Sequence, residues 1–404
     1  MNIFQPEFVS DQYFIATYFL QSKTTLRDAA WELAIGQSVG NPNVRSQWET
    51  EELFKNHSVI ILAEEDALKK TTSGVVKFAF PMANIGMWFD GVSQLLCQLM
   101  GGQMDIDNIV KCHLNELELP EQVIKTYFQL PKVGISGMRL HTGALHKPFL
   151  GGIVKPKVID KIDTLVAMVN EMVEGGVNFI KEDEIMANPH SCPLVTRVKT
   201  ISKIIEKTDV VYTYCINGDN VVERAKQVYE LGGSGIHINF WSGLGSYNAI
   251  RKLNMNMFIH FQKSGDKVIT NPNHDFHIKW DVICYLAGLM GVDSIHAGMW
   301  GGYLSDDEDE LRQTMATLHK RNVLPALSCG MHPGIVNTTA EKFGTDFLAN
   351  CGGAIHGHPG GTLAGALAMR QAIDKTPGPE FRAAIDKWGY ETGGGSLPEW
   401  VLDF

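Results

Sequence analysis

The feature that most constrains this chain is a repeat of short apolar segments that runs from about residue 148 towards the carboxyl terminus. Each segment has strand character and is followed by a helical stretch, in several cases closed by a glycine pair suited to a helix C-cap. Strands that alternate with helices form parallel β-structure. The segments are residues 151–156, 178–184, 210–216, 235–240, 257–262, 294–299, 325–330 and 347–353. Eight such units in about 250 residues predict a (β/α)8 barrel rather than an open doubly wound sheet, and no GxGxxG motif follows the first strand.

The residues before this repeat predict a smaller α+β domain of the ferredoxin-like kind. Strands are expected at residues 13–20, near 58–63 and at 74–80, and helices at about 25–35 and 92–100. We therefore predict an α/β protein with two domains. Residues 1–135 form the α+β domain, and residues 136–404 form the catalytic barrel with a short carboxyl-terminal extension.

Composition limits which kinds of binding partner and which cellular compartment are expected. With 35 basic and 45 acidic residues the formal charge is −10, which argues against nucleic acid or an anionic membrane as the main partner. The longest apolar run, near residues 282–292, is about half of the ~20 residues that span a bilayer. The first residues lack the pattern of a secretory signal. Seven cysteines without CxxC spacing fit reduced thiols, so we expect a cytoplasmic protein.

The densest charged cluster is Lys181-Glu182-Asp183-Glu184, at the end of the second barrel strand. Alternate side chains of a strand share a face, so Lys181 and Asp183 are expected to point into the barrel mouth with Glu184 close by. Two carboxylates and a third oxygen ligand would suit Mg²⁺. The alternative for four charges in a row is a solvated turn that opens a helix.

Further polar residues lie at the ends of other barrel strands. Lys155 and Lys157 flank Pro156 after the first strand, where a lysine can act as an acid or base, form a Schiff base, or simply be exposed. His260 and His296 close the fifth and sixth strands. Each alone could be a hydrogen-bonded core residue, but their matching positions favour a common ligand.

The last two strands end in glycine-rich turns. Ser328-Cys329-Gly330 follows the seventh strand, Gly352-Gly353 follows the eighth, and the sequence HGHPGG occupies 356–361. Loops at these two places in a barrel often bind phosphate through backbone amides. Glycine also serves tight bends, so position rather than composition favours a phosphate site.

Taken together, these motifs resemble the large-subunit superfamily of ribulose-bisphosphate carboxylase (RuBisCO). The resemblance covers nearly the whole barrel and, more loosely, the amino-terminal domain. It is carried by GGIVKPK, GGVNFIKEDE, the HF after strand five, SIHAG, LSCGMHPG and CGGAIHGHPGG. In this family the lysine of the KxDE motif reacts with CO2 to give a carbamate, which holds Mg²⁺ with the two following acids. The resemblance thus implies that Lys181 is carboxylated on Nζ and that Asp183 and Glu184 are the other ligands.

The resemblance also implies roles for the remaining residues. Lys155 matches the lysine that moves protons at the enediolate, and His260 and His296 match the two active-site histidines. The substrate and its phosphate would contact Lys157, Ser328, Gly330, Gly352 and Gly353. Family members share active sites between subunits, so a homodimer or a multiple of dimers is expected.

Three departures argue against CO2 fixation. Where carboxylases have a loop lysine seven residues past the strand-six histidine, this chain has Tyr303, and an acidic stretch follows it. The arginine that grips a second phosphate is replaced by Phe261, and the amino-terminal carboxylase residues are replaced around Gln37–Pro42. The chain therefore resembles the RuBisCO-like proteins, which use the Mg²⁺-enolate machinery for other reactions.

The expected activity is that of a Mg²⁺-dependent lyase on a phosphorylated keto sugar acid, of the 3-oxo-isoapionate-4-phosphate decarboxylase type. The first alternative is a 2,3-diketo-5-methylthiopentyl-1-phosphate enolase or a sugar-phosphate isomerase of the same superfamily. These enolases carry an amino-terminal lysine at the position of Gly102, and the nearest lysine here is Lys111. The second alternative is a non-catalytic protein that binds a phosphorylated metabolite. The carbamate triad speaks against it, because a pure binder does not need one.

Overall fold

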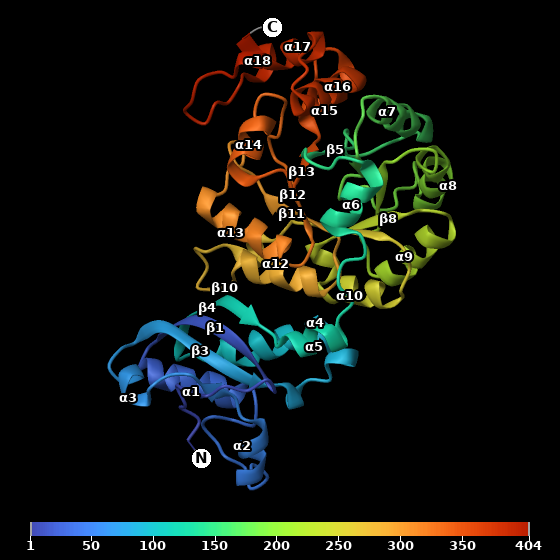
Figure 1. Ribbon diagram of the computed structural model, residues 1–404. Coiled ribbons are helices and arrows are strands. Elements are labelled where there is room, and N and C mark those ends of the chain that lie inside the picture. The colour runs from blue at the N-terminus through green and yellow to red at the C-terminus, as the bar shows by residue number, and fades with distance from the viewer. Residues whose placement is uncertain (1, 403–404) are drawn as a thin grey trace. The chain divides into compact units, whose positions relative to one another are not determined.

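The computed structural model describes residues 2–402 and divides into two units (Figure 1). Unit 1 comprises the residues up to Gln129 together with Asp266–Met290, and unit 2 comprises Leu130–Gly265 and the residues from Gly291 onwards. The predicted domains follow the chain without interruption, whereas unit 1 takes in a segment from the second half. The predicted boundary between the two domains, near residue 135, remains a prediction.

Unit 2 contains the predicted barrel. Eight parallel strands close in the order β11-β12-β13-β5-β6-β7-β8-β9, and each lies within or overlaps one of the eight predicted segments, which confirms the fold class. The strands are β5 (Phe149–Ile153), β6 (Phe179–Lys181), β7 (Val211–Cys215), β8 (Gly235–Asn239), β9 (Phe258–Gln262), β11 (Ser294–Gly298), β12 (Leu324–Leu327) and β13 (Leu348–Cys351).

Amphipathic helices surround these strands (Figure 1). In α7, for example, Leu165, Met168, Val169 and Met172 are buried, which is the spacing of a single helix face. The helices of unit 2 are α6 (Gly134–Thr142), α7 (Ile162–Glu174), α8 (Leu194–Ile205), α9 (Val221–Glu230), α10 (Gly245–Lys252), α13 (Glu308–His319), α14 (Val336–Phe343), α15 (Gly353–His356), α16 (Gly361–Asp374), α17 (Pro379–Trp388) and α18 (Glu399–Leu402).

An apolar cluster fills the amino-terminal end of the barrel. Two side chains of α6, Ile135 and Met138, join apolar residues of six barrel strands there. Because inward positions alternate along a strand, the next inward residue after Phe179 is Lys181, and the next after Phe258 is His260. The interior thus changes from apolar to polar within two residues. The strand residues of the cluster are Phe149, Phe179, Val211, Phe258, Leu324, Ala326 and Leu348.

Unit 1 is built on a five-stranded mixed sheet in the order β10-β4-β1-β3-β2. β1 pairs antiparallel with β3 and β4, whereas β10 pairs parallel with β4. The order 4-1-3-2 of the first four strands, with helices α1 and α4 between them, is the predicted ferredoxin-like arrangement. Neither β4 nor β10 was predicted. The strands are β1 (Tyr13–Ser22), β2 (Ile60–Ile61), β3 (Ser73–Pro81), β4 (Ile109–Glu118) and β10 (Phe276–Ile278); the helices are α1 (Leu26–Gly36), α2 (Glu51–His57), α3 (Glu65–Leu68), α4 (Met87–Leu99), α5 (Glu121–Tyr127), α11 (Lys267–Thr270) and α12 (Trp280–Leu289).

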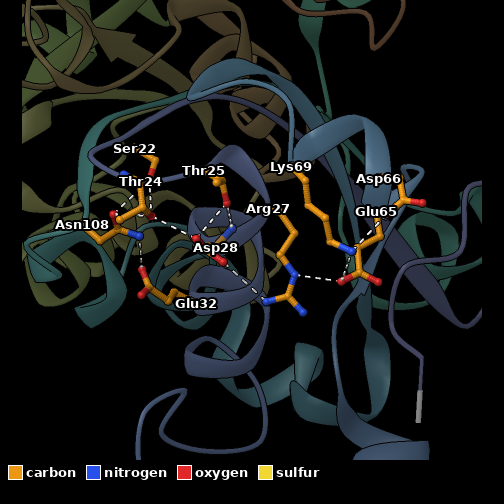
Figure 2. A network of polar contacts seen from close by, with 10 residues as sticks. All are labelled: Ser22, Thr24, Thr25, Arg27, Asp28, Glu32, Glu65, Asp66, Lys69 and Asn108. Atoms are coloured by element: carbon orange, nitrogen blue, oxygen red, sulfur yellow. Dashed lines mark hydrogen bonds and ion pairs between the residues drawn. The ribbon is translucent and has the colours of Figure 1, made fainter.

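A polar network fixes the start of α1 (Figure 2). Thr25 is the N-cap: its hydroxyl accepts a hydrogen bond from the backbone N–H of Asp28 at 3.1 Å and donates to the Asp28 carboxylate at 2.8 Å. Asn108, next to β4, accepts from the Ser22 hydroxyl at 3.0 Å and donates to Glu32 at 2.9 Å. The network therefore ties the helix to the ends of β1 and β4.

Two further findings concern the predicted compartment. Within residues 2–402, no helix combines the length and the hydrophobicity needed to cross a membrane. All seven cysteines are free of disulfide bonds, and five of them are buried. The cytoplasmic location itself remains an expectation.

Candidate active site

A pocket of about 490 Å³ lies in unit 2 among the residues that end the barrel strands. Asp183 and His260, which were also predicted, are fully buried and do not line it. Nine of the predicted site residues line the pocket: Lys155, Lys157, Lys181, Glu184, His296, Ser328, Gly330, Gly352 and Gly353.

A larger cavity of about 820 Å³ also lies in unit 2, lined by Tyr212, Phe258 and residues of α6 and α8. It contains none of the predicted site residues. We assign the active site to the smaller pocket because the titratable side chains and the glycine turns converge there. Such groups identify an active site better than the volume of a cavity does.

Lys181 is the deepest charged group of the site. Its side chain lines the pocket at the strand ends, as expected, but it is only 1% exposed. Burial lowers the pKa of Lys181, and the charges of Glu184 and Asp183 oppose that shift. A buried lysine whose pKa is lowered carries a larger fraction of neutral amine, which is the form that reacts with CO2.

Asp183 connects Lys181 to the first barrel strand. Its Oδ2 atom forms an ion pair with Nζ of Lys155, and its Oδ1 atom accepts from the backbone N–H of Ile185 at 3.3 Å. Asp183 is fully buried, whereas Lys155 is half-buried and lines the pocket. A Cβ atom on Gly352 would lie 3.3 Å from Cε of Lys155, so the lysine also adjoins the glycine turn after β13.

Glu184 is held through its backbone while its side chain lines the pocket. The carbonyl oxygen of Glu184 accepts hydrogen bonds from the Asn217 amide at 2.6 Å and from the Cys215 thiol at 3.4 Å. Cys215 is the last residue of the neighbouring strand β7, and Asn217 comes two residues after it. Because these two bonds hold the backbone of Glu184, its carboxylate is not needed for that purpose and can face a ligand in the pocket.

Glu182, between the inward residues, has a different environment. It is fully buried and pairs with Arg197 of α8 through two bonds, Nε to Oε1 at 2.8 Å and Nη2 to Oε2 at 3.0 Å. The Tyr212 hydroxyl donates to Oε1 at 3.1 Å and the Cys215 backbone N–H donates to Oε2 at 2.8 Å. Glu182 thus joins the barrel wall to its surrounding helix.

Three histidines lie inside the barrel around Lys181. Burial lowers the pKa of His296 to about 3 and those of His260 and His237 well below the ordinary value, and the charge of Lys181 adds to each shift. His296 Nε2 is 2.8 Å from the Ser328 hydroxyl, and His260 Nδ1 is 3.1 Å from the Ser294 hydroxyl. His296 lines the pocket and His260 does not, so a common ligand for the two stays a prediction.

The glycine turns are packed closely against neighbouring backbone. Gly330 has φ +122°, and a Cβ there would lie 2.6 Å from both Cα of Gly302 and N of Tyr303. A side chain at this position is therefore excluded by conformation and by contact. At Gly353, in contrast, a Cβ would meet nothing within 4 Å, so the backbone is open towards the pocket.

The residues that depart from the carboxylase pattern are not cationic, and each has its own surroundings. Tyr303 lines the pocket and is 87% exposed. Phe261 is fully buried and packs its ring against Tyr247 at 4.5 Å and Phe240 at 5.5 Å between centroids. Gln37, the C-cap of α1 in unit 1, donates its amide to the carbonyl of Cys97 at 3.0 Å.

Sequence reasoning missed four residues around the pocket. Gln262, His332 and Trp388 line it, and His237 is fully buried in the barrel with neither ring nitrogen bonded to any group within residues 2–402. His237 and Gln262 occupy inward positions of β8 and β9, so the alternation rule could have found them. Trp388 comes from α17, after the last strand, where no local signal places it at the site.

The donor set fits a hard divalent cation only if Lys181 is carboxylated. Asp183 and Glu184 offer two carboxylates, and within the described residues no three His, Cys, Asp or Glu side chains group as metal ligands. A carboxyl group on Lys181 would add the third oxygen donor. Unbonded polar atoms lie inside the barrel nearby, namely both ring nitrogens of His237, Nε2 of His260 and Oδ1 of Asn350. Such orphaned groups fit an interior that receives a polar group or water.

Comparison with known proteins identifies the family. The family described as ribulose bisphosphate carboxylase large chain, catalytic domain, matches residues 134–381. The chain is 28% identical over 414 residues to a ribulose bisphosphate carboxylase of Pyrococcus furiosus, covering 94% of this chain and 95% of the relative. It is 27% identical over 413 residues to a 2,3-diketo-5-methylthiopentyl-1-phosphate enolase of Geobacillus kaustophilus, covering 93% and 98%.

The fold agrees with that assignment. The structure of octameric RuBisCO from Pyrococcus horikoshii OT3 in complex with a sulfate ion matches with a TM-score of 0.85 at 23% identity, covering 95% of each chain. The chain therefore belongs to the RuBisCO large-chain superfamily, which contains both carboxylases and enolases.

Proposed function

We propose that this protein is a RuBisCO-like lyase that acts through an enediolate on a phosphorylated keto sugar acid. The observation that carries the proposal is the ion pair between Lys155, which lines the pocket, and the fully buried Asp183, with Lys181 and the glycine turns lining the same pocket. This arrangement combines a proton donor, a set of metal-binding oxygens and a backbone surface for a phosphate.

The metal site would form from this chain's own side chains after one covalent step. The nitrogen lone pair of neutral Lys181 attacks the carbon of CO2, an N–C bond forms while one C–O π bond breaks and its electron pair moves onto oxygen, and one N–H proton passes to water. The resulting carboxyl group would hold Mg²⁺ together with Asp183 and Glu184. When bound, Mg²⁺ supplies the positive charge that stabilises the developing enediolate oxygens.

Lys155 is the proposed proton donor. Its ammonium lies next to Asp183 and the pocket, so it can reach both the metal side and the glycine side of a bound ligand. In a decarboxylation, the carbon–carbon bond breaks, CO2 leaves and the electron pair remains on the enediolate. Only protonation of carbon then remains, and one positioned acid performs it.

Because one positioned acid suffices for decarboxylation, the site favours that reaction over enolisation. An enolase must first remove a carbon-bound proton, which requires a base in addition to the acid. Lys111, the nearest lysine to the expected amino-terminal position, pairs with Asp275 at 3.1 Å within unit 1. We therefore place first a β-keto acid of the 3-oxo-isoapionate-4-phosphate type.

An enolase is the second candidate, supported by one specific observation. A protein named 2,3-diketo-5-methylthiopentyl-1-phosphate enolase is 27% identical over 93% of this chain. A sugar-phosphate isomerase would use the same intermediate. A catalytically silent binder is the third possibility, and the buried Lys181 with its two carboxylates argues against it.

Carboxylation of ribulose 1,5-bisphosphate is not expected. Tyr303 supplies no cation, and the buried Phe261 ring cannot bind a second phosphate. The absence of 3-phosphoglycerate from labelled CO2 would agree with this, and its formation would contradict it.

The deciding experiment incubates the protein with Mg²⁺, bicarbonate and a panel of phosphorylated keto acids that includes the diketo phosphate. Product NMR follows CO2 release and proton exchange with solvent separately. CO2 release from a β-keto acid phosphate supports the lyase. Proton exchange without CO2 release supports the enolase, and neither with any substrate contradicts both.

We also propose that the active form is a two-fold dimer or a multiple of dimers, as the family resemblance implies. Light scattering with activity measured on the same fractions tests this. A fully active monomer would refute shared active sites.

A further inference from the structure

The larger cavity, of about 820 Å³, lies among the residues that begin the barrel strands, whereas the active-site pocket lies among those that end them. Val210 and Val211 line it at the start of β7, Ser234 lines it just before β8, and Phe258 lines it at the start of β9. Pockets that bind small molecules typically have volumes of about 300–1,000 Å³. The cavity is therefore large enough for a small organic ligand, and it is separate from the proposed chemistry.

Aromatic side chains form an uncharged wall of this cavity. Tyr212 and Tyr214 line it with their ring centroids 4.7 Å apart, and Phe258 lines it as well. Both tyrosines are buried, and burial raises the pKa of each phenol. Their hydroxyls already have partners: Tyr212 donates to Glu182 at 3.1 Å, and the Tyr214 hydroxyl lies 3.0 Å from that of Ser202. The wall thus offers a ligand aromatic surface rather than charge.

One face of α8 forms the charged side of the cavity. Four residues line it at the spacing i, i+3, i+4 and i+7, which places them on a single helix face: Lys199, Ser202, Lys203 and the C-cap Glu206. Lys199 and Lys203 are exposed, so they lie where the cavity opens to solvent. Among the described side chains of residues 2–402, neither ammonium group has an ion-pair or hydrogen-bond partner. The helix therefore presents two unpaired cations to this opening.

The charge around the cavity is positive overall. Lys132 and His141 add two further basic groups, whereas Glu206 is the one acid among the described residues of the lining. Lys132 is already engaged, because its ammonium donates to the backbone carbonyl of Asn254 at 2.9 Å and to the side-chain oxygen of the same residue at 2.7 Å. The whole chain carries a formal charge of −10, so this local excess of cations does not follow from composition.

We propose that this cavity binds an aromatic acid, with its ring against the tyrosine and phenylalanine side chains and its anionic group at Lys199 and Lys203. Burial of the ring removes apolar area from water and adds contacts between aromatic rings. A lysine ammonium without a partner forms a strong hydrogen bond to an anion. The site goes beyond the proposed function and does not depend on it, because no residue lines both the cavity and the active-site pocket.

The test uses two dyes that share the same rings. 8-Anilinonaphthalene-1-sulfonate carries one anionic group, and N-phenyl-1-naphthylamine is its uncharged counterpart. Each is titrated by fluorescence into the full-length protein. Lys199→Gln/Lys203→Gln should weaken binding of the anionic dye by about tenfold or more, the weight of one hydrogen bond between charged groups, and leave that of the neutral dye unchanged. Ser234→Phe places a large side chain in the cavity and should weaken both dyes.

Two controls locate the dye. Lys161→Gln/Lys207→Gln removes the same charge from exposed positions that do not line the cavity and should change neither affinity. Lys157→Gln removes a cation from the active-site pocket and should also change neither. Circular dichroism confirms that each variant is folded, and all five substituted residues are exposed.

Three outcomes would overturn the inference. The first is a wild type that binds neither dye. The second is an α8 double variant that binds the anionic dye as tightly as the wild type does, or loses both dyes equally. The third is loss of the anionic dye in Lys157→Gln but not in the α8 variant, which would place the dye in the active site. None of these outcomes bears on the lyase activity, which is measured separately by product NMR.

Discussion

The inner and outer faces of the barrel wall at β6 differ although adjacent residues build them. Lys181 and Asp183 face inward, where Asp183 pairs with Lys155 and three neutral histidines surround Lys181. Glu182 faces outward and receives hydrogen bonds from Arg197, Tyr212 and the Cys215 backbone.

The difference shows how burial can serve two purposes within one charged run. On the outer face both carboxylate oxygens of Glu182 are satisfied by protein groups, so nothing is left for a ligand. On the inner face both nitrogens of His237, Nε2 of His260 and Oδ1 of Asn350 have no partner among residues 2–402. Complete satisfaction indicates a structural role, whereas unmet hydrogen bonds indicate a place for something else.

The largest effect is expected from Lys181→Met, which tests the inner face. The variant keeps the length of the side chain but cannot be carboxylated, so the third metal ligand is lost. Because a metal contributes several kcal/mol to transition-state stabilisation, activity should fall by at least about a thousandfold. Turnover and the ¹³C NMR signal of a carbamate formed from labelled CO2 are measured together. Full activity, or full activity of wild type freed of CO2 and Mg²⁺, would contradict the assignment.

Lys155→Met should have the next largest effect. Loss of a general acid lowers product formation by roughly 10²- to 10⁴-fold while leaving metal and ligand binding intact. The measurement is the single-turnover rate, with ligand binding followed in parallel. Lys161→Met, an exposed lysine next to α7, is the matched control. A variant that reacts at the wild-type rate would remove Lys155 from the mechanism.

Glu182→Gln tests the outer face and should affect stability rather than chemistry. Breaking a buried ion pair leaves Arg197 without its charge partner, which costs about 3–5 kcal/mol of unfolding free energy. Urea unfolding measures this, and turnover is normalised to the folded fraction. Glu206→Gln, an exposed acid at the end of α8, is the control. The comparison fails if turnover per folded molecule collapses while stability stays unchanged.

The smallest effect concerns pH. His296 has a pKa lowered by burial from 6.5 to about 3, so between these values the unfolded chain binds a proton there that the native chain does not. Native stability should therefore fall as the pH falls through this window. His296→Gln should reduce the slope by up to about 1.4 kcal/mol per pH unit. Urea unfolding at pH 7, 6 and 5 measures it, with His146→Gln at an exposed position as control; an unchanged slope would place the His296 ring in contact with water.

Much of the fold was predictable because its signals are local. Strand and helix periodicities recur along the second half, and each of the eight predicted segments contains or overlaps a barrel strand. The alternation of β6 likewise predicted which charges of the run share a face. β10 was missed because three residues within a connection carry no periodicity, and only pairing with β4 makes them a strand.

The candidate site was predictable where residue type and strand position coincide, as at Lys155, Lys181 and Ser328. Exposure to solvent was not predictable: Lys181 lines the pocket at the strand ends as expected but is only 1% exposed, because the tilt and closure of the barrel set how far each strand end lies from solvent. The position of Trp388 was not predictable either, since helix α17 is held by contacts with loops distant in sequence.

The sequence by itself determined three things about the site: which strand residues face inward, which turns are glycine-rich and which carboxylase residues are replaced. The first two follow from alternation and residue type, and the third follows from the family resemblance; none of them needs a partner from elsewhere in the chain. Only the tertiary structure decided that Glu182 belongs to Arg197, that Lys155 pairs with Asp183 and that Trp388 walls the pocket. Each of these joins segments between 15 and several tens of residues apart, and such contacts depend on barrel closure and helix packing, which no local pattern records.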